Sequence, residues 1–553
     1  ARGLGDVYKR QVYLERRVSL CKCAHHHQRT RMKPLSQALM VGSRSRSIAR
    51  HAFSHAQAAR EAYCRFANGS HVLNYKTNDQ SSTWQRISTL VRARFAHLEM
   101  RRAAPLLSWI PRVRAFSTMT QNARGYAEAI DALNSLQSNA ATIEAVRRSG
   151  KTVNEFNEPE MTEYLERIGH KRADLDRIHV IHITGTKGKG STAAFCDALL
   201  RQVRPAGSGK IGLYTSPHMV AVRERIRIDG VPLSESDFSK YFWEVWDSLE
   251  ARPERQFEMT PLRPVYFRFM TLLAFHVFIS LQVSATLLEV GIGGMYDSTN
   301  IVQHPVVTGV SPLGLDHTAI LGNTLEEIAV QKAGIFKQDA PAYSSEQPQA
   351  ALAELEKYAK KVRASEFHVV RQLPGIETVA LGLPGDHQQI NASLAVALVQ
   401  AFASSDVGRA IYPGAEAQLG ANDGCALSPA VRRGLEQAFW PGRCQTVPAA
   451  ETAGANYYLD GAHTVESIEL CVRWFAHQVA EHRAPHMLVF NCTNGRSGRV
   501  LLGAALSELE KLLDGGSDAP KHARTFFNRV YFCTNNTFAH GGSASGTYKD
   551  RWN

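Results

Sequence analysis

The cysteines of this chain lack the spacing that a disulfide framework or a zinc site would need. Nine cysteines are scattered over 553 residues, and only Cys21 and Cys23 lie close together, beside three histidines at 25–27. The sequence around this pair disfavours a metal site there. The cysteine pattern therefore predicts no disulfide scaffold and fits a reducing compartment.

The body of the chain also lacks an excess of positive charge, although the formal net charge is +13. Residues 1–118 hold 22 lysines and arginines against five acids, whereas the remaining residues hold 42 basic and 46 acidic side chains. The basic character thus belongs to the leader. Because the body has no surplus of cations for a polyphosphate backbone, we expect no nucleic-acid partner.

Polar residues interrupt every apolar run that approaches the length of a membrane span, which needs about 20 predominantly apolar residues. The most apolar segment of the body, residues 269–290, contains His276, Gln282 and Ser284 and is followed by a glycine-rich loop. Its pattern divides into a buried helix and a buried strand. We therefore expect no stable membrane span.

One segment of the leader has arginines and apolar residues but no acidic residue. Residues 100–119 read MRRAAPLLSWIPRVRAFSTM, with four arginines and no acid. This composition is typical of a mitochondrial presequence at 100–118, and a disordered basic arm is the alternative. Starts at Met100 and Met119 would give a mitochondrial and a cytoplasmic form. Residues 1–99 show no sustained hydrophobic period, so we expect 1–118 to be a disordered leader.

From residue 178 onward, apolar runs alternate with helical stretches. Buried strands are predicted at IHVIHIT, KIGLYT, ATLLEV and VVTGV, and helices at STAAFCDALLRQV and TLEEIAVQKAGIF. This alternation predicts an α/β fold with a mostly parallel sheet covered on both faces. A smaller, Rossmann-like α/β domain is predicted from NYYLDGA, HMLVFNC and RVYFCTN. The Pro and Gly of FWPGRCQ place the hinge, which gives domains at 119–438 and 439–553.

The sequence GTKGKGST, at residues 185–192, follows an apolar strand and precedes a helix. Backbone N–H groups at a helix N-terminus bind phosphate oxygens, and Lys189 can reach the β and γ phosphates. The segment therefore predicts a phosphate loop of an ATPase domain. Gly190 stands where the common loop has its magnesium-binding Ser or Thr, so that hydroxyl is out of place.

Two further residues should emerge near this loop. Glu289 closes a predicted strand and His317 follows the next one, so both should lie at the carboxyl edge of the sheet. With a serine hydroxyl they can form a magnesium site, because Mg²⁺ prefers oxygen ligands and keeps several waters. Taken singly, Glu289 also fits a helix cap or a salt bridge, and His317 fits a structural histidine.

Nine motifs follow one another along the chain: GTKGKGST, TSPHM, VRERIRIDG, FRFMTLLAFHVF, LLEVGIGGMYDSTN, GLDHTAILGNTLEEIAVQKAGIFK, GDHQQINASLAVAL, WPGR and DGAHTVES. In order and wording they resemble the eukaryotic folylpolyglutamate synthase family of the Mur ligase superfamily, over residues 122–534. The resemblance implies a ligase that adds L-glutamate to the γ-carboxyl of tetrahydrofolate and its polyglutamates. ATP would activate that carboxyl as an acyl phosphate.

The resemblance also assigns individual residues. The ATP contacts would be Thr186, Lys187, Gly188, Lys189, Gly190, Ser191, Asn391, Arg443, Asp460 and His463. Two magnesium ions would be held by Ser216, Glu289 and His317, and Ser216 would supply the hydroxyl that Gly190 lacks. The catalytic residues would be Lys189, His317 and Lys332, the last matching a lysine that is carbamylated in several relatives. A monovalent cation and a monomeric state are also expected.

Three other functions compete with this interpretation. Dihydrofolate synthase, or an enzyme with both activities, shares the ATP machinery. A phosphate-loop ATPase that regulates a partner and a folate-binding pseudoenzyme are the other two. The family pattern continues beyond the last residue of this chain, so the small domain is expected to be truncated.

Overall fold

The computed structural model describes residues 124–137, 156–258, 260–420, 427–451, 454–480, 484–492, 497–513 and 523–533. The predicted leader, with Met100 and Met119, lies outside the described residues. The chain divides into two units, 1–121 and 122–553, and all the described residues belong to the second.

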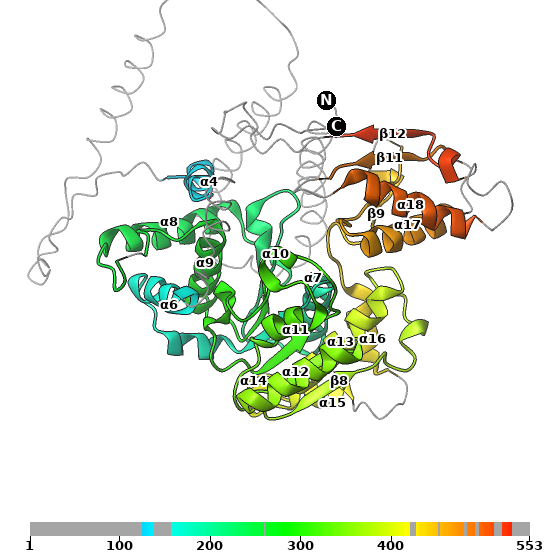
Figure 1. Ribbon diagram of the computed structural model, residues 1–553. Coiled ribbons are helices and arrows are strands. Elements are labelled where there is room, and N and C mark those ends of the chain that lie inside the picture. Colours follow the sequence, from blue (N-terminus) through cyan, green and yellow to red (C-terminus); the bar gives the residue numbers. More distant parts are fainter. Residues whose placement is uncertain are drawn as a thin grey trace, which may run out of the picture. The chain divides into compact units, whose positions relative to one another are not determined.

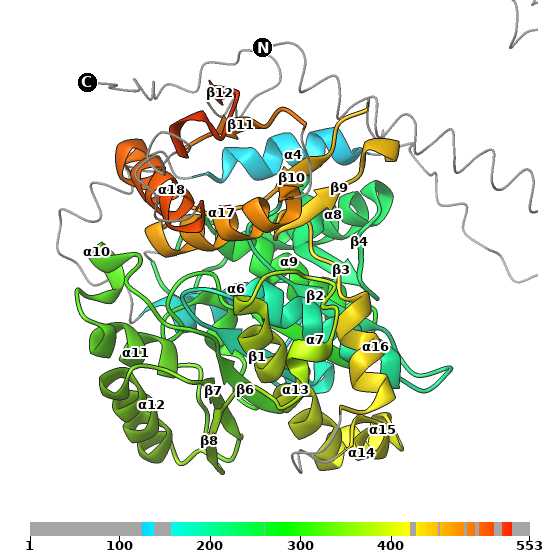
Figure 2. The same ribbon diagram turned by 90° about the vertical axis from the view of Figure 1, so that its right-hand side faces the viewer.

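An eight-stranded sheet forms the centre of this unit, in the order β4-β3-β2-β5-β1-β6-β7-β8 (Figure 2). Strands β2, β5, β1, β6, β7 and β8 are parallel to one another, β3 is antiparallel to β2, and β4 is antiparallel to β3. The predicted mostly parallel sheet is confirmed. The strands are β1 (Val180–Thr184), β2 (Ile211–Tyr214), β3 (Ile226–Ile228), β4 (Val231–Pro232), β5 (Ala285–Glu289), β6 (Val307–Val310), β7 (Ala342–Ser345) and β8 (Phe367–Val370).

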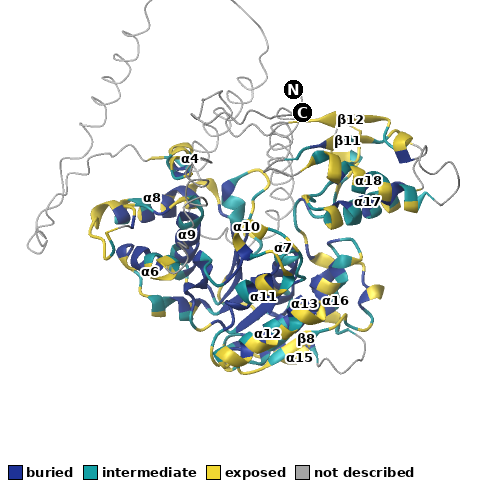
Figure 3. Cartoon of the chain, in the orientation of Figure 1, coloured by how far each residue is buried: buried dark blue, intermediate teal, exposed yellow. Residues whose placement is uncertain are grey.

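Helices cover both faces of the sheet because its apolar side chains alternate between them. Ile181 and Ile183 of β1 pack with α7 (Lys189–Val203) and α13 (His387–Ser404), outside which lie α14 (Asp406–Ile411), α15 (Ala415–Leu419) and α16 (Pro429–Gln437). Val180 faces the opposite way, toward α9 (Tyr266–Ser280). Figure 3 shows the resulting buried centre.

The second face is covered by two groups of helices (Figure 1). Around α9 lie α4 (Tyr126–Ser135), α6 (Asn157–Arg167) and α8 (Glu235–Ala251), and over β6 to β8 lie α11 (Leu325–Ala333) and α12 (Gln349–Val362). Short helical segments complete the unit: η2 (Arg172–Ile178), η3 (Val222–Arg225), η4 (Ser298–Ile301), α10 (Thr318–Leu321), η5 (Ile376–Thr378) and η6 (Ala449–Glu451).

The apolar segment at 269–290 forms most of α9 and then β5, as predicted. Among the described residues, no helix combines the length and the apolar character that crossing a membrane requires.

The described C-terminal residues form two small sheets and two α-helices. Three of the four strands lie in the predicted runs NYYLDGA, HMLVFNC and RVYFCTN, and the fourth, at Gln445–Val447, was not predicted. β9 (Gln445–Val447) pairs antiparallel with β10 (Tyr457–Leu459), and β11 (Met487–Phe490) pairs parallel with β12 (Arg529–Phe532). α17 (Val465–Val479) packs on α18 (Gly498–Leu512). The domain boundary at 439 stays a prediction, because the contacts group residues 122–553 as one unit.

Candidate active site

The glycine-rich loop connects β1 to α7, which is the context that a phosphate loop needs. Gly188 precedes the first residue of α7 and has a φ of 82°, in the left-handed region that favours glycine. A Cβ atom on Gly188 would lie 2.0 Å from Oδ1 of Asn391, and one on Gly185 would lie 1.9 Å from Oγ of Ser311. The glycines therefore let the loop approach α13 and the segment after β6.

Two lysines converge on one carbonyl of this loop. Nζ of Lys189 donates to the Gly185 carbonyl at 2.9 Å, and Nζ of Lys332, at the end of α11, donates to the same oxygen at 2.7 Å. Lys332 is buried. Burial is the main cause that lowers the pKa of both amines, and the charge of Lys189 lowers the pKa of Lys332 further. The structure thus brings two of the predicted catalytic residues together.

Glu289 ends β5 and lies beside the start of α7. Its Oε2 accepts the backbone N–H of Ser216 at 3.0 Å, and its two oxygens lie 3.6 and 3.7 Å from where a Cβ on Gly190 would stand. Burial raises the pKa of Glu289, and the Lys189 ammonium opposes that rise. Two of the predicted magnesium ligands, Ser216 and Glu289, are therefore neighbours beside the loop.

His317 lies beside Asp316, and its backbone carbonyl accepts the N–H groups of Ile320 and Leu321 at 2.9 and 3.0 Å. The backbone N–H of His317 donates to Oδ1 of Asp316 at 2.8 Å, and its Nε2 lies 3.9 Å from Oδ2 of that residue. The charge of Asp316 raises the pKa of both Lys189 and Lys332 toward the normal range. Asp316 is not among the residues singled out from the sequence, although its position at the sheet edge was available as a signal.

Asp460 and Arg443 belong to adjoining turns after α16. The carboxylate of Asp460 accepts the backbone N–H groups of Cys444 and Ala462, each at 2.8 Å, so it holds the two turns together. Nη1 of Arg443 donates to the Gly442 carbonyl at 3.2 Å, and the charge of Arg443 lowers the pKa of Glu289. Asp460 thus has a positioning role in this structure, while the Arg443 guanidinium acts electrostatically on the carboxylate beside the loop.

The segment from 440 to 466 also contacts the phosphate loop directly. Nζ of Lys187 pairs with Oε2 of Glu466 at 2.6 Å, and Nε2 of His463 lies 4.0 Å from Oδ2 of Asp316. Nε1 of Trp440 lies 3.5 Å from the position of a Cβ on Gly190. Trp440 and Glu466 were not singled out from the sequence, since nothing in their spacing indicates that they meet a loop more than 240 residues earlier.

Asn391 places an unused acceptor next to the loop. Its Nδ2 donates to Oε1 of Gln388 at 2.9 Å, whereas its Oδ1 has no hydrogen-bond partner and the residue is buried. A buried polar atom without a partner is unfavourable. This oxygen faces Gly188, where a ligand with an N–H donor could satisfy it.

Curated relatives match the chain over most of its length. It is 41% identical to folylpolyglutamate synthase of Neurospora crassa over 433 residues, 77% of each chain. It is also 41% identical to folylpolyglutamate synthase of Candida albicans over 434 residues, 76% of this chain and 81% of that one. The chain belongs to the folylpolyglutamate synthase family. Members are acid-amino-acid ligases of the Mur ligase superfamily, which confirms the family predicted from the motifs.

Solved structures share the fold. The apo form of L. casei FPGS superposes with a TM-score of 0.54 at 24% identity, covering 75% of this chain and 90% of that chain. An FPGS-AMPPCP-folate complex gives a TM-score of 0.52 at 22% identity, covering 74% of this chain and 97% of that chain. No family model matches the chain. These likenesses confirm the predicted fold class.

Proposed function

We propose that this chain adds L-glutamate to the γ-carboxyl of tetrahydrofolate and its polyglutamates, using ATP and an acyl-phosphate intermediate. The family assignment supports glutamate ligation to folates, and the complexes of neighbours with AMPPCP and folate support both substrates. The observation that carries the proposal is the convergence of Lys189 and Lys332 on the Gly185 carbonyl, beside the buried carboxylate of Glu289.

Each residue of this cluster has a task in such a reaction. An unactivated carboxylate does not form an amide in water, so transfer of the γ-phosphoryl group must come first. The Lys189 ammonium would neutralise charge that develops on that group, because preorganised charges in a water-poor site stabilise the transition state. Arg443 adds a second positive charge near Glu289. The Oδ1 of Asn391 would accept an N–H of the adenine.

The site also fits magnesium. Glu289 is a buried carboxylate whose raised pKa reflects the cost of its charge, and a divalent cation would offset that cost. The Glu289 carboxylate and the Ser216 hydroxyl are the hard oxygen donors that Mg²⁺ prefers, and His317 is proposed as a further ligand. When bound, the ion would supply charge neutralisation at the phosphates.

Lys332 suits carbamylation because burial lowers its pKa well below the usual value, which increases the fraction of neutral amine. A neutral amine adds to CO₂ and releases one proton, which gives a carbamate. The product is an anionic oxygen donor and would stand beside Lys189.

A glutamate-incorporation assay on the whole chain tests the proposal. Tetrahydrofolate, ATP and labelled glutamate should yield a product longer by one or more glutamates together with ADP, whereas pteroate should yield none. Product from pteroate would favour dihydrofolate synthase or the bifunctional enzyme. ADP release without glutamate would favour an ATPase.

Lys189→Ala should lower turnover at least about 100-fold, the usual loss when one preorganised charge-stabilising group is removed. The fold should persist, because Lys189 is only partly buried and donates to a loop carbonyl. Lys210→Ala, at an exposed lysine, is the matched control. Normal turnover of Lys189→Ala would disprove the phosphate-loop assignment.

We also propose that translation from Met100 and from Met119 gives a mitochondrial and a cytoplasmic form. The arginine-rich, acid-free composition of 100–118 supports this. Mass spectrometry of the mature N-terminus in separated mitochondria and cytosol tests it, and a single N-terminus in both fractions would contradict it.

A further inference from the structure

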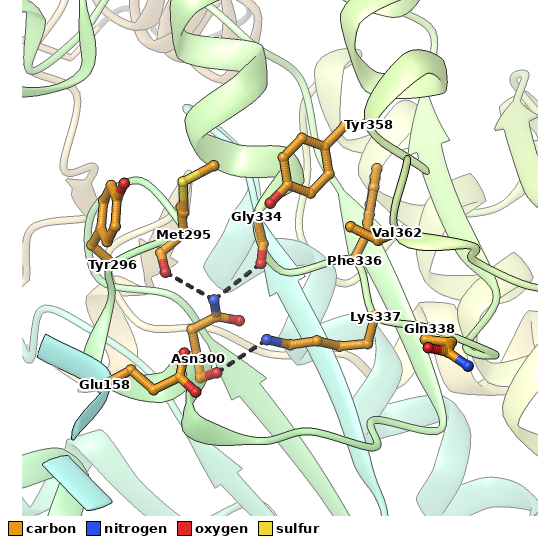
Figure 4. A pocket seen from close by; sticks show the side chains of 10 residues that line it. All are labelled: Glu158, Met295, Tyr296, Asn300, Gly334, Phe336, Lys337, Gln338, Tyr358 and Val362. Atoms are coloured by element: carbon orange, nitrogen blue, oxygen red, sulfur yellow. Dashed lines mark hydrogen bonds between the residues drawn. The ribbon is translucent and has the colours of Figure 1, made fainter. Parts of the chain in front are cut away.

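A cavity of about 350 Å³ lies next to the end of α11 (Figure 4). It is bounded by the loop after β5, which carries Met295 and Tyr296, by Phe336 and Lys337 after α11, and by Tyr358 of α12. Its volume is in the range of small-molecule pockets. The proposed reaction uses none of these side chains.

Asn300 contributes a buried acceptor to this cavity. Its Nδ2 donates to the carbonyls of Met295 at 2.9 Å and Gly334 at 3.0 Å, which fixes the orientation of the amide (Figure 4). The residue is 4% exposed, and its Oδ1 has no hydrogen-bond partner. Buried polar atoms are almost always paired, so this oxygen indicates a ligand that carries an N–H donor.

Lys337 contributes a positive charge next to that acceptor. Its Nζ donates to the backbone carbonyl of Asn300 at 3.3 Å, and an ammonium can donate two further hydrogen bonds. Burial lowers the pKa of Lys337 to about 8, and the nearby carboxylate of Glu158 opposes that change. The cavity lining therefore holds a cation, an amide acceptor and the carboxylate of Glu158, which also pairs with the Arg172 guanidinium outside the lining.

The remaining lining is largely apolar or aromatic. Met295, Phe336 and Val362 provide hydrocarbon and sulfur surface, and the rings of Tyr296 and Tyr358 stand on two sides (Figure 4). Lys337 is the one cation among the described residues that line the cavity.

We propose that this cavity binds an apolar or aromatic α-amino acid. The α-carboxylate would pair with the Lys337 ammonium, and the α-ammonium would donate to Oδ1 of Asn300 with Glu158 nearby. The side chain would lie among Met295, Phe336 and Tyr358. Because the two polar groups of an α-amino acid are separated by one carbon, they match two protein groups that come from the same corner of the cavity, at Asn300.

The site borders the machinery of the proposed reaction without belonging to it. The backbone N–H of Met295 donates to the Gln331 carbonyl at 2.7 Å, and Gly334 is packed against Met295. Lys332 lies between these two contacts on the chain. A ligand that touches Met295 and Gly334 would therefore contact the segment that positions Lys332.

Isothermal titration of the whole chain with L-phenylalanine tests the proposal. We expect one saturable site with a Kd below about 1 mM. Phenylpropanoate, which lacks the ammonium, and 2-phenylethylamine, which lacks the carboxylate, should each bind at least about 10-fold more weakly. No saturation by L-phenylalanine, or equal affinity for either analogue, would overturn the proposal.

Two variants test the cavity in different ways, one by removing its cation and one by filling its space. Lys337→Met should weaken L-phenylalanine at least about 10-fold by removing the partner of the carboxylate. Val362→Trp should abolish binding by filling the cavity. Lys360→Met, at an exposed lysine of α12, is the matched control and should bind normally. Unchanged binding in both Lys337→Met and Val362→Trp would place L-phenylalanine elsewhere and refute the assignment.

Discussion

His182, in the middle of β1, shows how one residue couples the core to pH. The ring is fully buried, Nε2 lies 2.9 Å from Oγ1 of Thr299, and Nδ1 has no hydrogen-bond partner. Burial lowers its pKa to about 3, with a smaller contribution from the Lys337 charge. The neutral ring is thus built into the strand that leads to the phosphate loop.

We predict that His182 makes the fold sensitive to acid. As the pH falls below about 6.5, the unfolded histidine takes up a proton that the folded one refuses until about pH 3, so stability is lost across that window. At 1.36 kcal/mol per pH unit, the loss by pH 4.5 is about 2 to 3 kcal/mol. Urea unfolding at pH 7 and pH 4.5 should show a shallower pH dependence for His182→Leu. Parallel losses in both proteins would show that other groups dominate.

At the scale of the element, the start of α7 combines two glycines with opposite requirements. Gly188 has a positive φ and touches Asn391, whereas Gly190 lies within the first turn, beside Glu289 and Trp440. A Cβ on Gly190 would meet its neighbours at ordinary contact distance. The first glycine therefore serves the fold, and the second keeps room beside the Glu289 carboxylate.

These requirements predict different outcomes for the two alanine variants. Gly188→Ala should cost about 1 to 3 kcal/mol of unfolding free energy through backbone strain. Gly190→Ala should leave stability equal or raise it by up to about 1 kcal/mol, because alanine favours the helix. It should still lower turnover about 100-fold by displacing the phosphates. Urea unfolding and the ligase assay measure both, and full activity in Gly190→Ala would show that the phosphates lie elsewhere.

Elements were more predictable from the sequence than the contacts between them. The apolar runs that became β1, β2, β5 and β6 are each buried on both faces, which gives a strong local signal. The convergence of Lys189 and Lys332 on the Gly185 carbonyl depends on the parallel sheet, which brings α11 to the loop. Only the family motifs indicated that these two lysines belong to one site. The cavity near Lys337 joins three segments with no shared motif, so no local pattern could reveal it.

At the scale of the whole molecule, the site is assembled from segments far apart in the chain. The loop at 185–192 meets Trp440 near Gly190, and Lys187 pairs with Glu466 at the start of α17. Arg443 acts on Glu289 from the same later segment. We predict from these contacts that catalysis depends on how the later segment approaches the loop, as in enzymes whose closure completes the site.

Glu466→Gln should lower turnover while leaving the free energy of unfolding almost unchanged. The pair with Lys187 is partly exposed, so its loss should change the unfolding free energy by less than about 1 kcal/mol. Turnover should nevertheless fall several-fold, because Lys187 loses the partner that holds the loop against α17.

A salt titration tests the same ion pair. About 0.3 M tetramethylammonium chloride should screen the pair in the wild-type protein and lower the turnover of that protein, while the variant responds less. Glu469→Gln, one turn further along α17, is the control. Equal salt responses in all three proteins would mean that the Lys187–Glu466 pair does not bring the two segments together during turnover.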